Sequence, residues 1–217
     1  MSTDSDSVLN KDLDLKPESA EKTGVSFEHR FSRRPGGREN SVFTLVIGGS
    51  ASGKSDYAER HVLSLEGGGP RIYIATMEPF GEEARARIAR HHALRRDRGF
   101  ETIECYRNIG SLRLPADSNV LLEDLGNLMA NELFGNDAAA VDEAADLPDR
   151  IAEEIEKVFS DCAHMTIVTN EIFSGGKNYE GETIIYLRAL ARLNRILAKR
   201  ADYVVELVCG LPDVLKE

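Results

Sequence analysis

A glycine-rich segment near residue 50 constrains the fold of this chain more than any other feature. The segment matches the pattern G-x-x-x-x-G-K-[ST] at every position, and its residues are Gly48, Gly49, Ser50, Ala51, Ser52, Gly53, Lys54 and Ser55. An apolar run, residues 43–47, precedes it, and an amphipathic helical pattern follows it. A strand, a glycine-rich turn and a helix in this order predict a phosphate-binding P-loop. The alternative is a glycine-rich turn that binds no ligand.

The residue types of this segment suit a nucleoside triphosphate. Glycines let the backbone turn tightly, so that its N–H groups can point at phosphate oxygens. The helix start adds a partial positive charge at the same place. We expect Lys54 to reach the β- and γ-phosphates and Ser55 to bind Mg²⁺. All eight residues are therefore predicted to bind the nucleotide.

Apolar runs and helical patterns alternate through the rest of the chain. The runs span residues 43–47, 72–75, 120–122, 165–169 and 203–208, and helical spacing follows Pro148 and continues again from Ile184. This alternation predicts an α/β fold, a RecA-like P-loop domain with a mainly parallel sheet and helices on both faces. Ligands of such sheets bind at the carboxyl ends of the strands. We interpret residues 135–149, which are rich in Ala and Asp, as a surface loop.

The composition changes near residue 42. Residues 1–41 are polar and bury too little apolar surface to offset the entropy of ordering, so we expect a flexible extension before a domain at 42–217. The acidic start is unlike a secretory signal, and no apolar run is long enough for a membrane span. Three widely spaced cysteines indicate reduced thiols, so we expect a cytoplasmic protein. The net charge of −10 disfavours nucleic acid as a partner.

Four further residues have candidate roles. Glu123 is the first polar residue after the run 120–122, where a P-loop protein needs an acid beside the metal, and Asp124 is the alternate. An ordinary loop carboxylate is the other interpretation. His61 lies on the inner face of the helix after the loop and is predicted to be packed there. Glu171 ends a strand, where it either binds substrate or metal or fixes the loop by a hydrogen bond.

A basic segment with adjacent histidines spans residues 86–96. Its pattern alone predicts an amphipathic helix whose histidines, His91 and His92, are solvated. A metal pair is disfavoured, because neighbours in the sequence do not face one site on a helix.

The order of these motifs resembles that of the bifunctional adenosylcobinamide kinases / adenosylcobinamide-phosphate guanylyltransferases of cobalamin biosynthesis. The resemblance covers about residues 42–216. It rests on an ordered set of matches: residues 46–55, Tyr73 to Thr76, Arg87-Ile88, His91-His92, Arg96, Thr102, Glu104-Cys105, Leu121 to Glu123, Asn131, Val168 to Glu171, Arg192, Asn194, Leu197-Ala198, Ala201-Asp202 and Gly210 to Pro212. The chain departs from the family pattern at Ala51, where members often carry an arginine.

The resemblance implies two activities. The enzyme would phosphorylate the aminopropanol hydroxyl of adenosylcobinamide with GTP or ATP, and then transfer GMP from GTP to the new phosphate. By resemblance His91 carries the GMP, and the GTP site is lined by Thr76, His92, Arg95, Glu104 and Glu123. The resemblance also implies a homotrimer. Two other interpretations remain: a one-step small-molecule kinase, and a nucleotide-switched binding protein or oligomeric ATPase.

Overall fold

A single seven-stranded sheet organises the part of the chain that the structure describes. This computed structural model describes residues 41–65, 69–79, 97–135, 145–175 and 179–217. The strands are β1 (Val42–Gly48), β2 (Arg71–Ala75), β3 (Phe100–Glu104), β4 (Asn119–Leu122), β5 (His164–Asn170), β6 (Tyr203–Val208) and β7 (Leu211–Lys216). The helices are α1 (Lys54–Ser64), α3 (Leu125–Phe134), α4 (Leu147–Asp161) and α5 (Glu182–Arg200), with a short 3₁₀ turn at Ile109–Ser111. The predicted extension, except Ser41, lies outside these residues.

The strand order β3-β2-β4-β5-β1-β6-β7 places β1 inside the sheet. Strands β1 to β6 are mutually parallel, and only β7 pairs antiparallel, with β6. The carboxyl ends of the parallel strands therefore lie along one edge. The register places Gly48 opposite Asn170 on one side and opposite Leu207 on the other.

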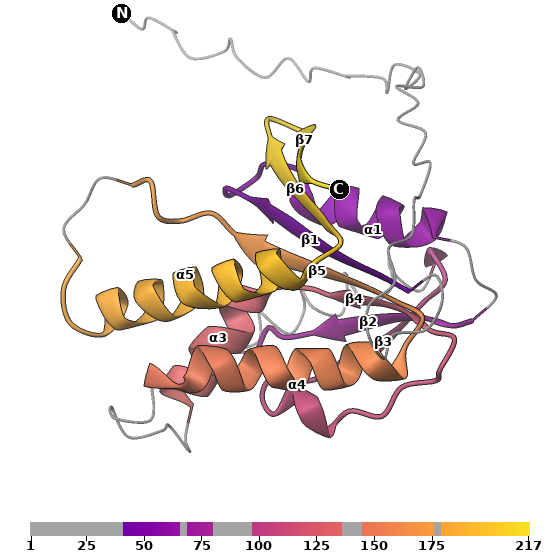
Figure 1. The fold of residues 1–217 in the computed structure, drawn as a ribbon, viewed down its shortest axis with the longest axis horizontal. Helices are drawn as coiled ribbons and strands as arrows, with labels where there is room; N and C mark the ends of the chain where they lie inside the picture. Colours follow the sequence, from indigo (N-terminus) through magenta and orange to yellow (C-terminus); the bar gives the residue numbers. More distant parts are fainter. Residues whose placement is uncertain (1–40, 66–68, 80–96, 136–144, 176–178) are drawn as a thin grey trace, which may run out of the picture. The chain divides into compact units, whose positions relative to one another are not determined.

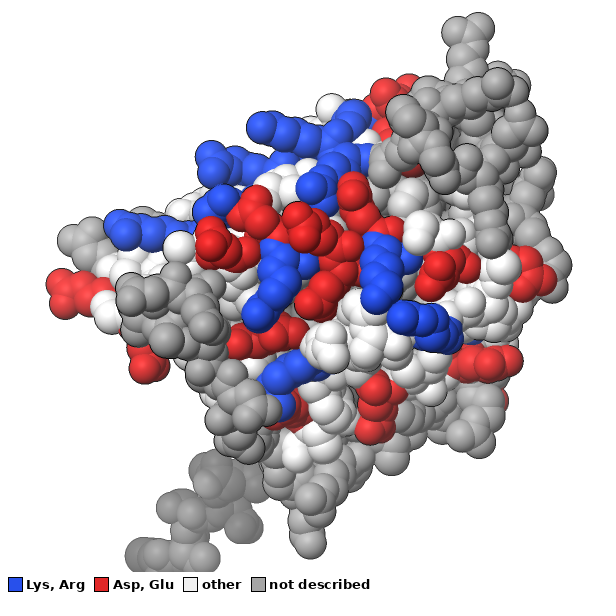
Figure 2. All heavy atoms as spheres, turned by 60° about the horizontal axis from the view of Figure 1, so that its bottom comes forward, with Lys and Arg blue, Asp and Glu red and all other residues white. Residues whose placement is uncertain are grey.

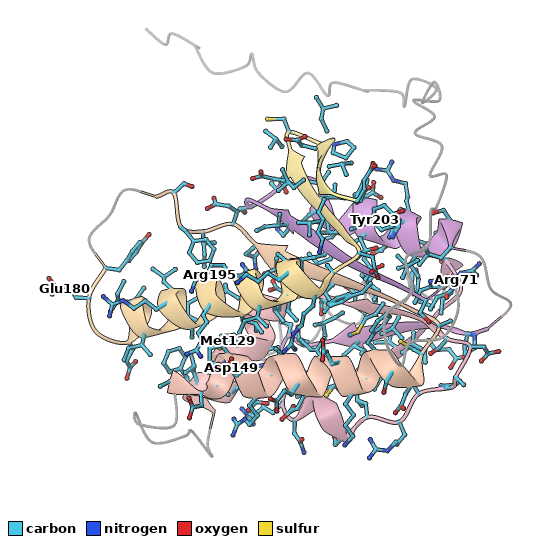
Figure 3. All side chains as sticks on the ribbon, in the orientation of Figure 1. Arg71, Met129, Asp149, Glu180, Arg195 and Tyr203 are labelled. Carbon is cyan, nitrogen blue, oxygen red and sulfur yellow. The ribbon has the colours of Figure 1, made fainter. Side chains whose placement is uncertain are left out.

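Helices cover both faces of the sheet, as the sequence predicts (Figure 1). Helix α1 packs on one face, where Val46, Ala58 and Val62 belong to one buried cluster. Helices α3, α4 and α5 cover the other face and share the larger cluster. Figure 3 shows the side chains of this layer, among them Met129, which is fully buried. Apolar burial on two faces explains why the central strands are continuous apolar runs.

The predicted strands are confirmed, with boundaries extended by one or two residues, and β6 spans the predicted residues 203–208. Two strands were not predicted, and both are edge strands. Strand β3 carries Glu101 and Glu104, and β7 carries Pro212. Proline has no backbone N–H to donate to a neighbouring strand, so it is tolerated in an edge strand. Neither has the apolar run of a central strand.

The prediction of a surface loop over residues 135–149 is wrong for its last residues, which belong to helix α4. Helix α4 begins at Leu147, which is buried, and Pro148 occupies its first turn, where a missing N–H costs nothing. The burial of Leu147 against the core is a tertiary contact that local composition does not reveal. Residues 136–144 lie outside the described residues.

The outer surface around α4 carries both signs of charge. Figure 2 shows acidic and basic side chains interleaved on this face. Arg150 pairs with Glu132 at 3.5 Å, and Arg200 pairs with Glu156 at 3.3 Å. Such exposed pairs contribute little to stability. Among the described residues, no helix is long and apolar enough to cross a membrane.

Truncation of the α4 core contact should destabilise the fold. Ile155 is fully buried between α4 and the sheet. We expect Ile155→Ala to lower the free energy of unfolding by about 2 to 5 kcal/mol, because transfer and cavity terms add. The matched control is Lys157→Ala on the exposed side of the same helix, with a change within about 0.5 kcal/mol. Urea denaturation measures both, and equal losses would contradict the assigned packing.

Candidate nucleotide site

The phosphate loop connects β1 to α1 and bends where the predicted glycines lie. A Cβ on Gly48 would stand 2.5 Å from the Ser52 hydroxyl and 2.9 Å from the Leu207 carbonyl oxygen, so no larger residue fits without a shift. Gly53 has φ 91°, a left-handed conformation that favours glycine. The Ser52 hydroxyl is buried and makes no hydrogen bond within the described chain. A buried donor without a protein partner is suited to a ligand oxygen.

Two contacts hold the loop in this shape. The Lys54 ammonium donates to the Gly49 carbonyl oxygen at 3.1 Å, so this half-buried side chain folds back over the loop. The Gly210 N–H, in the turn between β6 and β7, donates to the Ser52 carbonyl oxygen at 2.9 Å. Ser50, Ala51 and Ser55 are exposed. The loop thus brings the Lys54 side chain and the start of α1 together in one compact turn.

Glu123 lies directly after β4, at the same edge of the sheet as the loop. Its backbone N–H donates to the Ile74 carbonyl oxygen at 3.0 Å, and its carboxylate accepts a hydrogen bond from the Thr76 N–H at 3.3 Å. The side chain is half-buried. The structure therefore places this carboxylate between the ends of β2 and β4.

Asp124, the alternate acid, caps α3. Its Oδ1 accepts from the Gly126 N–H at 2.7 Å and from the Asn127 N–H at 3.2 Å. Both Asp124 oxygens also accept from the Asn170 amide, at 2.9 and 3.0 Å. An aspartate directly before an apolar helix is an N-cap signal, and this role was missed in the sequence.

Thr76 and Asn131 join the ends of three segments. Thr76 is fully buried, and its hydroxyl donates to the Asp124 carbonyl oxygen at 2.9 Å. The Asn131 amide, on α3, donates to the carbonyl oxygens of Thr76 at 2.8 Å and Tyr106 at 3.1 Å. The Thr76 side chain thus fixes the base of the predicted site rather than standing free in it.

Glu104 lies at the end of the edge strand β3 and is exposed. It accepts a hydrogen bond from the Tyr106 hydroxyl at 2.7 Å. Partial burial, followed by this carboxylate, raises the pKa of Tyr106 to about 12, so the phenol keeps its proton. Four strand intervals separate β3 from β1, or about 19 Å at the usual spacing. Glu104 and the phosphate loop therefore lie far apart along the same edge.

Glu171 and His61 have structural contacts. The Glu171 N–H donates to the Gly48 carbonyl oxygen at 2.9 Å, and its carboxylate accepts from the Phe173 N–H at 3.1 Å and the Ser174 hydroxyl at 3.0 Å. These bonds fit the predicted role in fixing the loop. His61 is buried, bonds to the Thr44 hydroxyl at 3.0 Å and stacks on Tyr57, which confirms a packed histidine.

The histidine segment is the part of the predicted site that the structure does not describe. His91, His92 and Arg95 lie within residues 80–96, outside the described residues. Its flanks are described: Met77 to Pro79 leave the carboxyl end of β2, and Asp97 to Gly99 lead into β3. Among the described residues, no cluster of three or more His, Cys, Asp or Glu side chains could hold a metal by itself.

Comparison with known proteins agrees with this arrangement. The profile of the family described as "Cobinamide kinase / cobinamide phosphate guanyltransferase" matches residues 44–215. The chain is similar to the bifunctional adenosylcobalamin biosynthesis protein CobU of Salmonella typhimurium, with 36% identity over 78% of this chain and 97% of the relative. It is also similar to the bifunctional adenosylcobalamin biosynthesis protein CobP of Pseudomonas aeruginosa, with 31% identity over 79% and 96%.

Among solved structures, a flagellar accessory protein from Methanocaldococcus jannaschii aligns over 81% of this chain and 78% of its own, with 12% identity and a TM-score of 0.46. The family profile, in contrast, spans nearly the whole described domain and includes the phosphate loop, Glu123 and the segment with His91. The chain therefore belongs to the cobinamide kinase / cobinamide phosphate guanyltransferase family, whose members are enzymes with a kinase and a guanylyltransferase activity.

Proposed function

We propose that this chain phosphorylates the aminopropanol hydroxyl of adenosylcobinamide and then transfers GMP to that phosphate through a guanylyl-histidine at His91. The observation that carries the proposal is the shared edge of the sheet. The phosphate loop, Glu123 and the start of the segment that carries His91 all leave carboxyl ends of parallel strands. This is where ligands of parallel sheets bind.

In the kinase step, the loop holds the triphosphate of GTP or ATP. Its N–H groups and the start of α1 face the phosphates, and Lys54 leaves the Gly49 carbonyl oxygen to meet the β- and γ-phosphates. The Ser55 hydroxyl and the Glu123 carboxylate are hard oxygen donors of the kind that suits Mg²⁺. Bound Mg²⁺ would neutralise charge on the phosphate oxygens.

In the guanylyl step, a neutral His91 nitrogen attacks the α-phosphorus of GTP. An N–P bond forms, the bond from the α-phosphorus to the bridging oxygen breaks, and pyrophosphate leaves. The phosphate oxygen of adenosylcobinamide phosphate then attacks the same phosphorus, and the N–P bond breaks to release the histidine. Arg95, four positions after His91 in the sequence, would stabilise charge on the phosphate oxygens.

The strand order gives the nucleotide a direction along the edge. From β3 to β1 the predicted residues follow the order Glu104, Thr76, Glu123 and the loop. With the γ-phosphate at Lys54, we propose that the guanine lies toward Glu104, whose carboxylate can accept hydrogen bonds from the base. The α-phosphate then lies between these ends, and His92 lines the same stretch.

The chain length permits His91 to reach this position. Strand β2 lies three strand intervals from β1, or about 14 Å. Twelve residues connect Pro79 to His91, and an extended chain of that length spans about 40 Å. These twelve residues are therefore long enough for His91 to reach a nucleotide held by Lys54.

We propose that the protein acts in the cytoplasm as a homotrimer and that residues 42–217 carry both activities. The β6–β7 hairpin supports assembly, because it exposes an apolar group at a sheet edge: Val208, Leu211, Val214 and Leu215. Leu211 is 72% exposed. Apolar edge strands are usually covered in solution.

The guanylyl-histidine gives the first prediction of this section. Incubation with Mg²⁺ and GTP labelled at the α-phosphate should leave label on the intact protein, and the bond should be labile to acid and stable to base, as a phosphoramidate is. We expect His91→Ala to abolish the label and the neighbouring His92→Ala to retain at least part of it. Mass spectrometry of the labelled peptide identifies the residue. A label that persists in His91→Ala would refute the intermediate.

The absence of any adduct together with phosphorylated corrinoid would favour the one-step kinase. Slow nucleotide hydrolysis that does not respond to adenosylcobinamide would favour the nucleotide-switched binding protein. Neither outcome depends on the stability of a variant, because both are measured on the unaltered chain.

Lys54 gives the second prediction. We expect Lys54→Ala to lower kcat/KM of adenosylcobinamide phosphorylation by at least about a hundredfold, because a preorganised cation that stabilises transition-state charge contributes a factor of this size. Arg60→Ala, on the exposed side of α1, is the control and should change it by less than twofold. Release of labelled γ-phosphate to the corrinoid measures the rate. Wild-type activity in Lys54→Ala would exclude the loop as the kinase site.

Assembly gives the third prediction. We expect the wild-type chain to sediment with about three times the 24.0 kDa mass of one chain, and Leu211→Arg to shift the population toward monomers, because a buried unpaired charge opposes association. Analytical ultracentrifugation measures the masses. A monomeric wild-type chain would contradict the trimer, and an unchanged trimer in Leu211→Arg would exclude the hairpin as its interface.

A further inference from the structure

The Asp124 carboxylate makes more contacts than helix capping requires. Capping uses Oδ1, which accepts from the Gly126 and Asn127 N–H groups. The Asn170 side-chain nitrogen donates to both oxygens, at 2.9 and 3.0 Å, across 46 positions of sequence. The pair therefore ties the end of β4 to the end of β5.

The packing around the pair is close. A Cβ on Gly126 would stand 2.8 Å from the Tyr186 hydroxyl, 3.0 Å from Asp124 Oδ1 and 3.1 Å from Asn170 Nδ2. Burial and then the charge of Asp124 raise the pKa of Tyr186 to about 12, so this neighbour stays neutral. The arrangement leaves the Asn170 amide little freedom to rotate.

The orientation of the amide has a chemical consequence. Because the Asn170 nitrogen is directed at Asp124, its Oδ1 is directed away from that residue as a hydrogen-bond acceptor, and it makes no hydrogen bond within the described chain. Asn170 pairs in register with Gly48, at the start of the phosphate loop. The residue that carries this acceptor therefore lies next to the start of the phosphate loop, and its side chain reaches Asp124 at the carboxyl edge of the sheet.

We propose that Asp124 is a positioning residue that acts through Asn170 in the kinase step. Asp124 holds the amide so that Asn170 Oδ1 accepts a hydrogen bond from the attacking hydroxyl. The hydroxyl oxygen bonds to the γ-phosphorus, the bond to the β–γ bridging oxygen breaks, the nucleoside diphosphate leaves with that electron pair, and the hydroxyl proton passes to water. This inference rests on the proposed kinase function. It also assigns Asp124 to orientation rather than to metal binding.

A reciprocal exchange tests the orientation. In Asp124→Asn the new Oδ1 can still cap α3, because asparagine is a good N-cap. Its nitrogen, however, replaces the Oδ2 acceptor and faces the Asn170 nitrogen, so Asn170 keeps only the bond to Oδ1. We expect the Asn170 amide, no longer held by two acceptors, to turn over and offer a donor where it offered an acceptor. In the double variant Asp124→Asn with Asn170→Asp, the nitrogen at 124 donates to one carboxylate oxygen at 170 and the other oxygen is again an acceptor.

We expect Asp124→Asn to lower kcat of phosphoryl transfer by about tenfold, less than the roughly hundredfold cost of a 1 Å misplacement, with nucleotide Kd within twofold and Tm within a few degrees. The double variant should recover at least half of the loss on a logarithmic scale. Asn127→Ala, which keeps the backbone donors of α3, is the matched control and should change kcat by less than twofold. A merely structural role for Asp124 would lower Tm and nucleotide affinity together and would not be rescued by the exchange.

Unchanged kcat in Asp124→Asn, or a loss that the double variant does not recover, would overturn the inference. Failure of the proposed function is distinguishable from this, because it is seen in the wild-type chain as absent transfer to adenosylcobinamide. In that case hydrolysis of GTP, in which water supplies the attacking hydroxyl, is measured for the same four proteins, and the same pattern of loss and recovery is expected.

Discussion

The close approach of the β1 end to its neighbours is the contact on which the site depends. Gly48 lies in register with Asn170 and Leu207, and a single added carbon would collide with the Ser52 hydroxyl and the Leu207 carbonyl oxygen. Backbone hydrogen bonds from Glu171 to Gly48 and from Gly210 to Ser52 then anchor the loop on both sides. The contacts with the sheet therefore fix the backbone shape of the loop. Donors held in place in this way can stabilise phosphate charge in the transition state without reorganisation of the loop backbone.

The local parts of this arrangement could be predicted from the sequence. The loop motif, the central strands and the acid after β4 each have a signal within a few residues, because burial on both faces enforces apolar runs and the loop requires particular residue types. Strands β3 and β7 lack this signal, since edge strands tolerate Glu101 and Pro212. The cap at Asp124 was available from its place before Leu125 and was missed because the same residue was read only as a possible metal ligand.

The non-local parts could not be predicted. Nothing near Glu104 in the sequence shows that its strand lies four positions from β1, since strand order depends on which surfaces pack together. The contact between Asp124 and Asn170 likewise joins residues 46 positions apart. The predicted roles of His91, His92 and Arg95 remain predictions, because these residues lie outside the described chain. Thr76 shows that a residue of the predicted site can have its hydroxyl engaged inside the protein.

The strand order also bears on why one chain would carry two transfer reactions. A kinase step breaks a bond at the γ-phosphorus, and a guanylyl step breaks one at the α-phosphorus of a second triphosphate, so the two nucleophiles must approach different points of the nucleotide site. On the proposed orientation, the acceptor hydroxyl meets the γ-phosphate beside β1 and β5, where Asn170 lies, whereas His91 approaches from the end of β2. Strand β4 lies between these two approaches. On this proposal, each reaction uses its own triphosphate bound at the same loop, and the strand order keeps the two nucleophiles apart.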